Sequence, residues 1–209
     1  EYTTKKQVVE DMSRCFRYID DGKDMFVIKI LNTDYNTQQF AFVNDAYITK
    51  HLKRIRLWKE GSEWFTAYQL LIENWSKFAV KGVKFNSNRD DVLSMFHGYV
   101  HNTLEQVDMN KIQMFLDFVK EIIANNDKEI YDYVLNWIAY IIQHPGKKTE
   151  TALILKGLQG IGKNRFTDVL CELMAGYSTK NITDISELTG TFNSVVEGRM
   201  LLILNEMKN

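Results

Sequence analysis

The chain has 209 residues, of which 45% are hydrophobic and 25% charged, and its formal net charge is −1. These fractions are those of a soluble globular protein with one large or two small domains. The charge balance gives no general electrostatic argument for nucleic-acid binding, although a local basic surface would still allow it. No uninterrupted apolar stretch approaches the roughly 20 residues that cross a bilayer, so we expect no membrane association.

The two cysteines, Cys15 and Cys171, lie far apart in the chain. This spacing argues against a disulfide framework and for a reducing, intracellular compartment. No apolar segment follows the basic start at Lys5 and Lys6, so a signal peptide is not expected. The sequence also begins without methionine, which suggests a processed or excised piece of a longer protein.

The first eighty residues predict a mixture of helix and strand. Thr4 and Gln7 have the spacing of a helical capping box, and Asp20 to Lys23 interrupt the pattern that follows it. The elements expected here are a helix from Val8 to Ile19, a hairpin of strands over 25–31 and 39–43, and a helix from Trp64 to Phe78.

Two amphipathic helices follow. The apolar stripe of the first is Ile112, Phe115, Leu116, Val119, Ile122 and Ile123, and that of the second is Ile130, Tyr133, Val134, Trp137, Ile138, Ile141 and Ile142. Their repeat of three to four residues is that of a helix with one buried face. His144-Pro145-Gly146 ends the second helix and contains the chain's single proline, so we place a domain boundary there.

A glycine-rich loop then stands between a predicted strand, 151–156, and a predicted helix from Arg165 to Met174. It reads Gly157-Leu158-Gln159-Gly160-Ile161-Gly162-Lys163-Asn164. Glycines let backbone N–H groups turn inward toward phosphate oxygens, and the helix directs its positive end at the same anion. Lys163 adds a charge that reaches the β and γ phosphates. The order of strand, loop and helix predicts triphosphate binding rather than a simple glycine-rich turn.

The last position of this motif, normally Ser or Thr, is Asn164. A hydroxyl at this position binds Mg²⁺, and an amide oxygen can bind the ion or one of its waters. The departure therefore weakens the metal assignment more than the phosphate assignment.

A second element is the apolar segment from Met200 to Leu204, which ends in Asn205-Glu206. In phosphate-loop enzymes a strand of this kind presents an acid beside the γ phosphate. Asn205 stands where Asp is usual, so its magnesium contact would be weak or through water, and Glu206 would activate the attacking water. The alternative is a buried strand with a solvated end.

Six segments within roughly residues 80–209 form an ordered set: Val83-Lys84-Phe85, Val92 to Tyr99, Trp137 to His144, Gly157 to Asn164, Leu188 to Ser194 and Leu201 to Glu206. In combination they resemble the viral primase-helicases of the poxvirus type, superfamily 3 helicases of the AAA+ class.

The resemblance implies an ATP-dependent DNA helicase that acts as a hexameric ring on single-stranded DNA, at a viral replication site or in the host cytoplasm. It implies an α/β protein: a mostly helical N-terminal accessory region with a small hairpin (1–80), a helical domain (81–146) and a partial, C-terminally truncated P-loop AAA+ core (147–209). ATP would bind residues 157–165, that is Gly157, Leu158, Gln159, Gly160, Ile161, Gly162, Lys163, Asn164 and Arg165. Lys163 and Glu206 would be catalytic, and Asn164 and Asn205 would hold Mg²⁺.

The family's sensor Asn and arginine finger would lie beyond Asn209. In the AAA+ order the predicted strand over 151–155 would also lack both neighbouring strands, so its backbone groups would need other partners. We therefore expect the chain to be a fragment of a longer enzyme.

Four other features are open to two interpretations. His97 and His101 have the spacing of helical metal ligands but are expected to be ordinary polar residues. The basic clusters Lys53-Arg54-Ile55-Arg56 and Lys147-Lys148 could contact phosphates, but solvated faces are the favoured interpretation. The stripe of Trp64, Tyr68, Trp75 and Phe78 is expected in a core rather than under stacked bases.

Two other functions compete with the helicase. One is a nucleotide-binding scaffold without turnover, which Asn164 and Asn205 favour. The other is a different phosphate-loop enzyme, such as a kinase or a packaging ATPase, although no residues for binding a kinase acceptor are evident.

Overall fold

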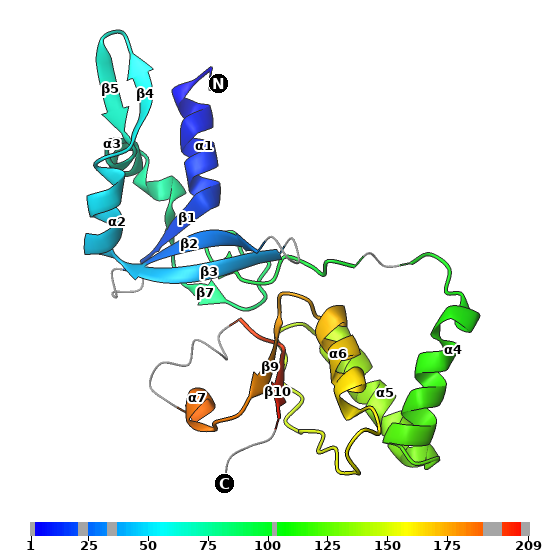
Figure 1. The fold of residues 1–209 in the computed structure, drawn as a ribbon. Coiled ribbons are helices and arrows are strands. Elements are labelled where there is room, and N and C mark those ends of the chain that lie inside the picture. The colour runs from blue at the N-terminus through cyan, green and yellow to red at the C-terminus, as the bar shows by residue number, and fades with distance from the viewer. Residues whose placement is uncertain (1–2, 21–24, 33–36, 102–103, 190–197, 206–209) are drawn as a thin grey trace. The chain divides into compact units, whose positions relative to one another are not determined.

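The computed structural model describes residues 3–20, 25–32, 37–101, 104–189 and 198–205, in two compact units, Glu1–His97 and Gly98–Asn209 (Figure 1). The division at residues 80 and 146 stays a prediction, but the hydrophobic core of the second unit draws residues from both sides of Pro145.

The first helix, α1 (Lys5–Cys15), begins at the predicted capping box. The Thr4 hydroxyl accepts from the Gln7 amide, and the Gln7 side chain accepts from the Thr4 amide. The prediction that this helix reaches Ile19 is wrong, because residues Phe16–Ile19 form strand β1. β1 pairs antiparallel with β2 and parallel with β6. The spacing of its apolar residues is compatible with helix or strand, and pairing with these two strands decides for the strand.

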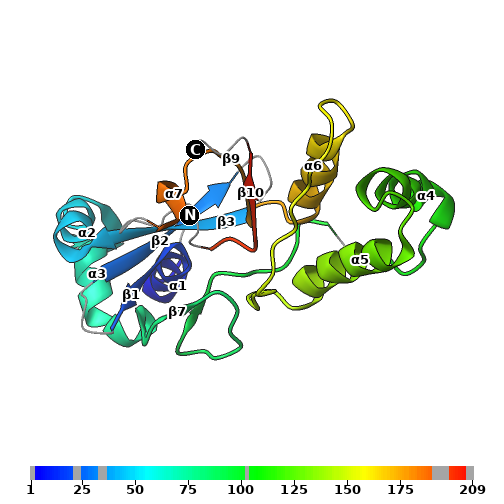
Figure 2. The ribbon, with the colours of Figure 1, turned by 90° about the horizontal axis from the view of Figure 1, so that it is seen from below.

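The sheet of the first unit has the strand order β3-β2-β1-β6. β2 (Met25–Asn32) and β3 (Thr37–Asn44) form the predicted antiparallel hairpin, and β6 is Ala79–Val80. Helices α1, α2 (Asp45–Leu52) and α3 (Ala67–Glu73) lie on one side of this sheet (Figures 1 and 2). They bury one core with the strands, made of Val8, Val9, Met12, Phe16, Tyr18, Phe26, Ile48, Leu52, Ala67, Leu70, Leu71 and Phe78.

The opposite side of the sheet carries a smaller cluster. Successive side chains of a strand point to opposite faces, so Phe40 and Phe42 of β3 pack with Ile19 and Val80 there, while Val43 packs in the main core. The short parallel pair β7 (Val83–Lys84) and β8 (Leu93–Ser94) adds Val83 and Leu93 to this cluster.

The predicted helix from Trp64 to Phe78 is wrong in its first and last parts. Strands β4 (Arg56–Glu60) and β5 (Glu63–Thr66) form a hairpin that contains Trp64, and α3 is followed by a 3-10 turn, η1 (Trp75–Lys77). Trp64 is therefore 46% exposed instead of lying in a core stripe. Tyr68, Trp75 and Phe78 of the same stripe do pack in the core.

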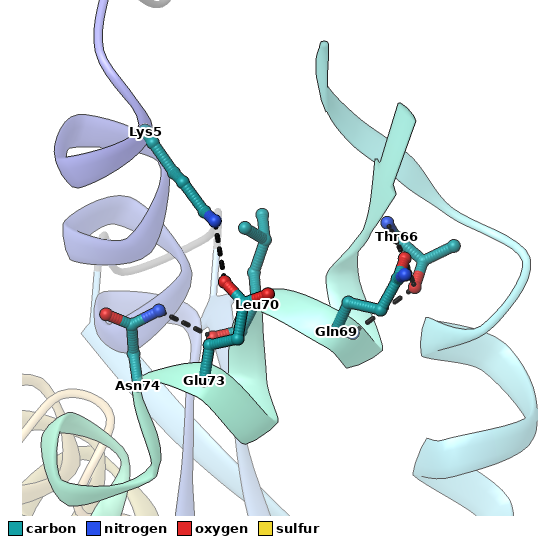
Figure 3. A network of polar contacts seen from close by, with 6 residues as sticks. All are labelled: Lys5, Thr66, Gln69, Leu70, Glu73 and Asn74. Carbon is teal, nitrogen blue, oxygen red and sulfur yellow. Dashed lines mark hydrogen bonds and ion pairs between the residues drawn. The ribbon is translucent and has the colours of Figure 1, made fainter. Parts of the chain in front are cut away.

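A second capping box explains where α3 starts. The Thr66 hydroxyl accepts from the Gln69 amide at 3.2 Å, and the Gln69 side chain accepts from the Thr66 amide at 2.8 Å (Figure 3). At the other end of α3, Glu73 Oε2 forms an ion pair with Lys5 Nζ at 2.6 Å, which links α3 to α1. The cap therefore sets the boundary between strand β5, which ends at Thr66, and helix α3, which begins at the next residue.

The second unit begins with the two predicted amphipathic helices. α4 (Met109–Phe118) runs into a π-helical turn, η2 (Val119–Ile123), and α5 (Lys128–Gln143) starts at Asp127, whose carboxylate accepts from two amides. Then follow α6 (Lys163–Leu173), β9 (Ser178–Ile182), α7 (Ser186–Thr189) and β10 (Leu201–Leu204). The core residues are Val119, Val134, Ile138, Ile141, Phe166, Leu170, Met174, Leu201 and Ile203.

The predicted strand over 151–156 is absent from the structure, where these residues have no regular secondary structure. Ile154 is 79% exposed. Within the described part of the chain β9 and β10 pair in parallel with each other, and no strand pairs with residues 151–156. A strand forms when its backbone groups find partners, so the apolar run alone was not sufficient. In the described ranges no helix is long and apolar enough to cross a membrane.

We predict that Thr66→Ala lowers the free energy of unfolding by about 1 kcal/mol, because it leaves the first turn of α3 without its side-chain acceptor. Ser62→Ala, in the exposed turn of the neighbouring hairpin, is the matched control and should change it by less than about 0.5 kcal/mol. Urea unfolding followed by circular dichroism measures both. Equal effects of the two substitutions would contradict the role of the cap.

Candidate nucleotide-binding site

The glycine-rich loop is an exposed connection that leads directly into α6. Gly157, Leu158, Gln159 and Gly160 are exposed, and Ile161, Gly162 and Lys163 are partly buried. Gly160 has φ +84° and Gly162 has φ +98°. Residues with side chains rarely adopt this left-handed conformation, so the two glycines let the backbone reverse twice within three residues.

The start of α6 is open to a ligand. Gly162 is the N-cap, and no side chain caps the first turn. The first amides of a helix have no acceptor within the helix and carry its positive dipole end. The three predicted binding residues Lys163, Asn164 and Arg165 form this first turn. The sequence-predicted residues thus meet at an anion-compatible helix start.

Lys163 folds back over the loop. Its Nζ donates to the carbonyl oxygens of Gly157 at 3.0 Å and Leu158 at 2.7 Å. The ammonium group is therefore held within the curve of the loop. Phosphate oxygens are stronger acceptors for an ammonium group than neutral carbonyls, because they are charged.

Phe118, at the end of α4, fixes the position of Gly162. A Cβ placed on Gly162 would lie 2.9 Å from Cε2 and 3.1 Å from Cζ of Phe118. The loop therefore needs glycine at this position both for its φ and for the space that the ring occupies. Phe118 was not predicted, because it lies outside the apolar stripe of this helix and no local signal connects two residues so far apart in the chain.

The predicted metal-binding pair receives less support. Asn205 donates through Nδ2 to Oδ1 of Asn181 at 3.0 Å, and its amide donates to the carbonyl of Ile182 at 3.1 Å. Its hydrogen bonds go to the end of β9, and Glu206 lies outside the described residues. In the part of the chain that the structure describes, no three His, Cys, Asp or Glu side chains gather as metal ligands. The roles of Asn164, Asn205 and Glu206 stay predictions.

Tyr99 connects the start of the second unit to the end of α5. Its hydroxyl donates to the carbonyl of Ile142 at 2.7 Å, and burial raises the pKa of Tyr99 to about 12. The same segment contains the histidine pair, and residues 95–101 form no helix. The His97 ring packs beside Phe40, while His101 lies 3.5 Å from a carboxylate oxygen of Glu172. The helical spacing that would make the histidines a metal pair is therefore not realised.

Two comparisons find a likeness to one phage protein. No family model matches it. Over 94 residues it is 32% identical to the DNA primase-polymerase of Nitratiruptor phage NrS-1, an alignment that covers 42% of this chain and 13% of that protein. The apo structure of the NrS-1 C-terminal region resembles the whole chain, with a TM-score of 0.58, 15% sequence identity and 47% of that structure covered.

The chain thus spans less than half of the NrS-1 primase-polymerase and less than half of the structure of its C-terminal region. The structural likeness, at 15% identity, concerns the fold alone. Both likenesses are to a phage protein and give no support to the narrower assignment to poxvirus-type, superfamily 3 helicases.

We predict that Gly162→Ala destabilises the chain more than Gly160→Ala. Each substitution places a side chain at positive φ, which costs about 1–2 kcal/mol. Only Gly162→Ala also meets Phe118, since the Cβ position at Gly160 has no neighbour within 4 Å. Thermal unfolding should therefore show a larger loss for Gly162→Ala, and its excess over Gly160→Ala should vanish when both are made in a Phe118→Ala background. An excess that persists there would contradict the contact.

Proposed function

We propose that the loop from Gly157 to Asn164 binds the phosphates of ATP. The chain would then be the ATP-dependent helicase portion of a viral or mobile-element primase-helicase that acts in DNA replication. The observation that carries the proposal is the arrangement of the loop. Two left-handed glycines precede an uncapped helix start, and the one lysine of the loop is held inside the curve.

The chemistry of these residues fits a triphosphate. Amides in the first turn of α6 would donate hydrogen bonds to the phosphate oxygens, and the helix dipole would add to this attraction. Lys163 would exchange the carbonyl oxygens of Gly157 and Leu158 for phosphate oxygens. Mg²⁺ bound with ATP would neutralise charge that develops during hydrolysis. Asn164 would contact the ion or one of its waters.

The elements after the loop support a P-loop core of the AAA+ kind. Chain order runs from the loop through α6 to β9, then through α7 to β10, and β9 and β10 are parallel neighbours. Parallel strands joined through a helix are characteristic of α/β nucleotide-binding sheets. β10 ends at Leu204, so Asn205 and Glu206 would follow it as the polar end of the second motif. Glu206 would then orient the attacking water.

The likeness to a phage primase-polymerase supports a role in viral DNA replication inside an infected cell. Single-stranded DNA as partner, a hexameric ring, and a viral replication site or the host cytoplasm as location are proposals from the family resemblance. Primer synthesis is not assigned to this chain, because the aligned part covers 13% of the protein that carries that name.

A second candidate is a nucleotide-binding scaffold without turnover. Asparagines stand at both positions where the motifs normally have a hydroxyl and a carboxylate ligand for Mg²⁺. The amide of the Asn205 side chain is also hydrogen-bonded to Asn181. This arrangement would weaken metal binding more than phosphate binding, which favours binding over hydrolysis.

We predict that Lys163→Ala weakens binding of Mg·ATP to the 209-residue chain by roughly 10- to 100-fold, the usual effect of losing hydrogen bonds to a charged group. Lys156→Ala is the matched control, since Lys156 is an exposed lysine of the same segment. Isothermal titration calorimetry measures both. Affinity that survives in Lys163→Ala, or that disappears only in Lys156→Ala, would contradict the site.

Hydrolysis separates the two candidate functions. The protein should hydrolyse ATP faster when single-stranded DNA is added, and Lys163→Ala should abolish that stimulation. Tight binding of ATP without hydrolysis would instead favour the scaffold.

A further inference from the structure

The β4–β5 hairpin of the first unit presents a cationic and aromatic surface that the nucleotide site does not use. We call it the outer face of the hairpin and define it by Arg56, Lys59, Trp64 and Thr66. Residues 50–68 around it contain five Lys and Arg against two Glu, whereas the whole chain has a net charge of −1. Positive charge is therefore concentrated in this segment.

A register shift between Arg56 and Trp58 creates the outer face. Arg56 pairs with Thr66, but Trp58 pairs with Phe65, so Leu57 is an extra residue in β4. Such a bulge changes which side chains share a face. Leu57 and Trp58 both pack against the core. Arg56 and Lys59 then lie on the other face, which a regular strand would not allow for residues three apart.

The same register separates the charges. Lys59 pairs with Trp64, and Glu60 pairs with Glu63. Because paired residues share a face and neighbours alternate, the two glutamates lie on the side of Trp58 and Phe65. In the described ranges Arg56 and Lys59 have no carboxylate within ion-pair distance. The cations of the outer face are therefore available to an anion.

Trp64 supplies an exposed ring on this face. It is 46% exposed, while Trp58 and Phe65 on the inner side are the hairpin aromatics that pack against the core. Lys59 Nζ lies 5.8 Å from the Trp64 ring centroid. Next to the hairpin, Lys53 Nζ lies 4.8 Å from the Tyr68 ring centroid, and Arg54 is exposed. Two lysines of this segment thus lie over aromatic rings, one on the hairpin and one beside it.

We propose that the outer face of the β4–β5 hairpin binds single-stranded DNA, with Arg56 and Lys59 on the phosphates and Trp64 stacked on a base. Cations that follow the backbone together with an exposed aromatic ring are the combination that binds unpaired strands, because a base must leave its duplex to stack. The surface belongs to another unit than the nucleotide loop and needs no ATP. Only the choice of DNA over RNA rests on the proposed function.

The test is fluorescence anisotropy of a labelled 20-nucleotide oligothymidine with the 209-residue chain at several salt concentrations, without nucleotide. Arg56→Ala/Lys59→Ala should weaken binding about tenfold or more and reduce the slope of log affinity against log salt by about 1.4, since each phosphate contact on a single strand contributes about 0.7. Trp64→Ala should weaken binding at least about fivefold, and Trp64→Phe should restore most of it.

The control is Lys6→Ala/Lys111→Ala, which removes two exposed cations elsewhere in the chain. It should leave the affinity within about twofold. Circular dichroism of each variant, matching the parent, excludes loss of folding. The proposal is overturned by the absence of oligothymidine binding, by an equal loss in the control, by equal affinity for a 20-base-pair duplex, by unchanged binding in Trp64→Ala, or by tighter binding of oligouridine. Each of these results leaves the Mg·ATP titration, and so the proposed nucleotide site, unaffected.

Discussion

The close approach of Phe118 to Gly162 is the constraint on which the candidate site depends. The ring occupies the space that any side chain at Gly162 would need, and the left-handed backbone there starts α6 at Lys163. One turn further, Phe166 is almost fully buried and stacks on Phe115 at 6.3 Å between ring centroids. Two aromatic residues of α4 therefore hold the first turn of α6, so the core of the second unit determines where an anion would meet the helix dipole.

Sequence patterns predicted those parts of the fold that depend on interactions between residues close in the chain. The capping box at Thr4, the hairpin of β2 and β3, and the helices α4 and α5 are confirmed because each depends on residues close in the chain. The predicted apolar stripes are buried only in part, since Ile112, Ile122, Ile130 and Tyr133 are exposed. The predictions failed where pairing between distant segments decides. Residues Phe16–Ile19 became a strand because β2 and β6 flank them, and residues 151–156 did not, because no described strand does. β9 was not expected from its polar sequence.

The candidate site was partly predictable for the same reason. The glycine spacing and Lys163 identified the loop, since left-handed turns favour glycine and a phosphate-binding loop places a lysine at a fixed position in its motif. The contact from Phe118 could not be predicted, because it joins two helices that are distant in the chain. The β4–β5 hairpin was also not predicted. It exposes Trp64, which the helical spacing had assigned to a core, and the bulge in β4 places Arg56 and Lys59 on one face.

Nuclear magnetic resonance of the ¹⁵N-labelled 209-residue chain, titrated with Mg·ATP, shows directly whether ATP binds at the start of α6. Backbone amides at a helix start report an anion that binds there, whatever the rate of hydrolysis. We expect the largest chemical-shift changes on Gly160, Gly162, Lys163 and Asn164, with little change in the β4–β5 hairpin. A titration in which the amides of residues 157–165 stay unshifted while another segment responds would contradict the proposed site.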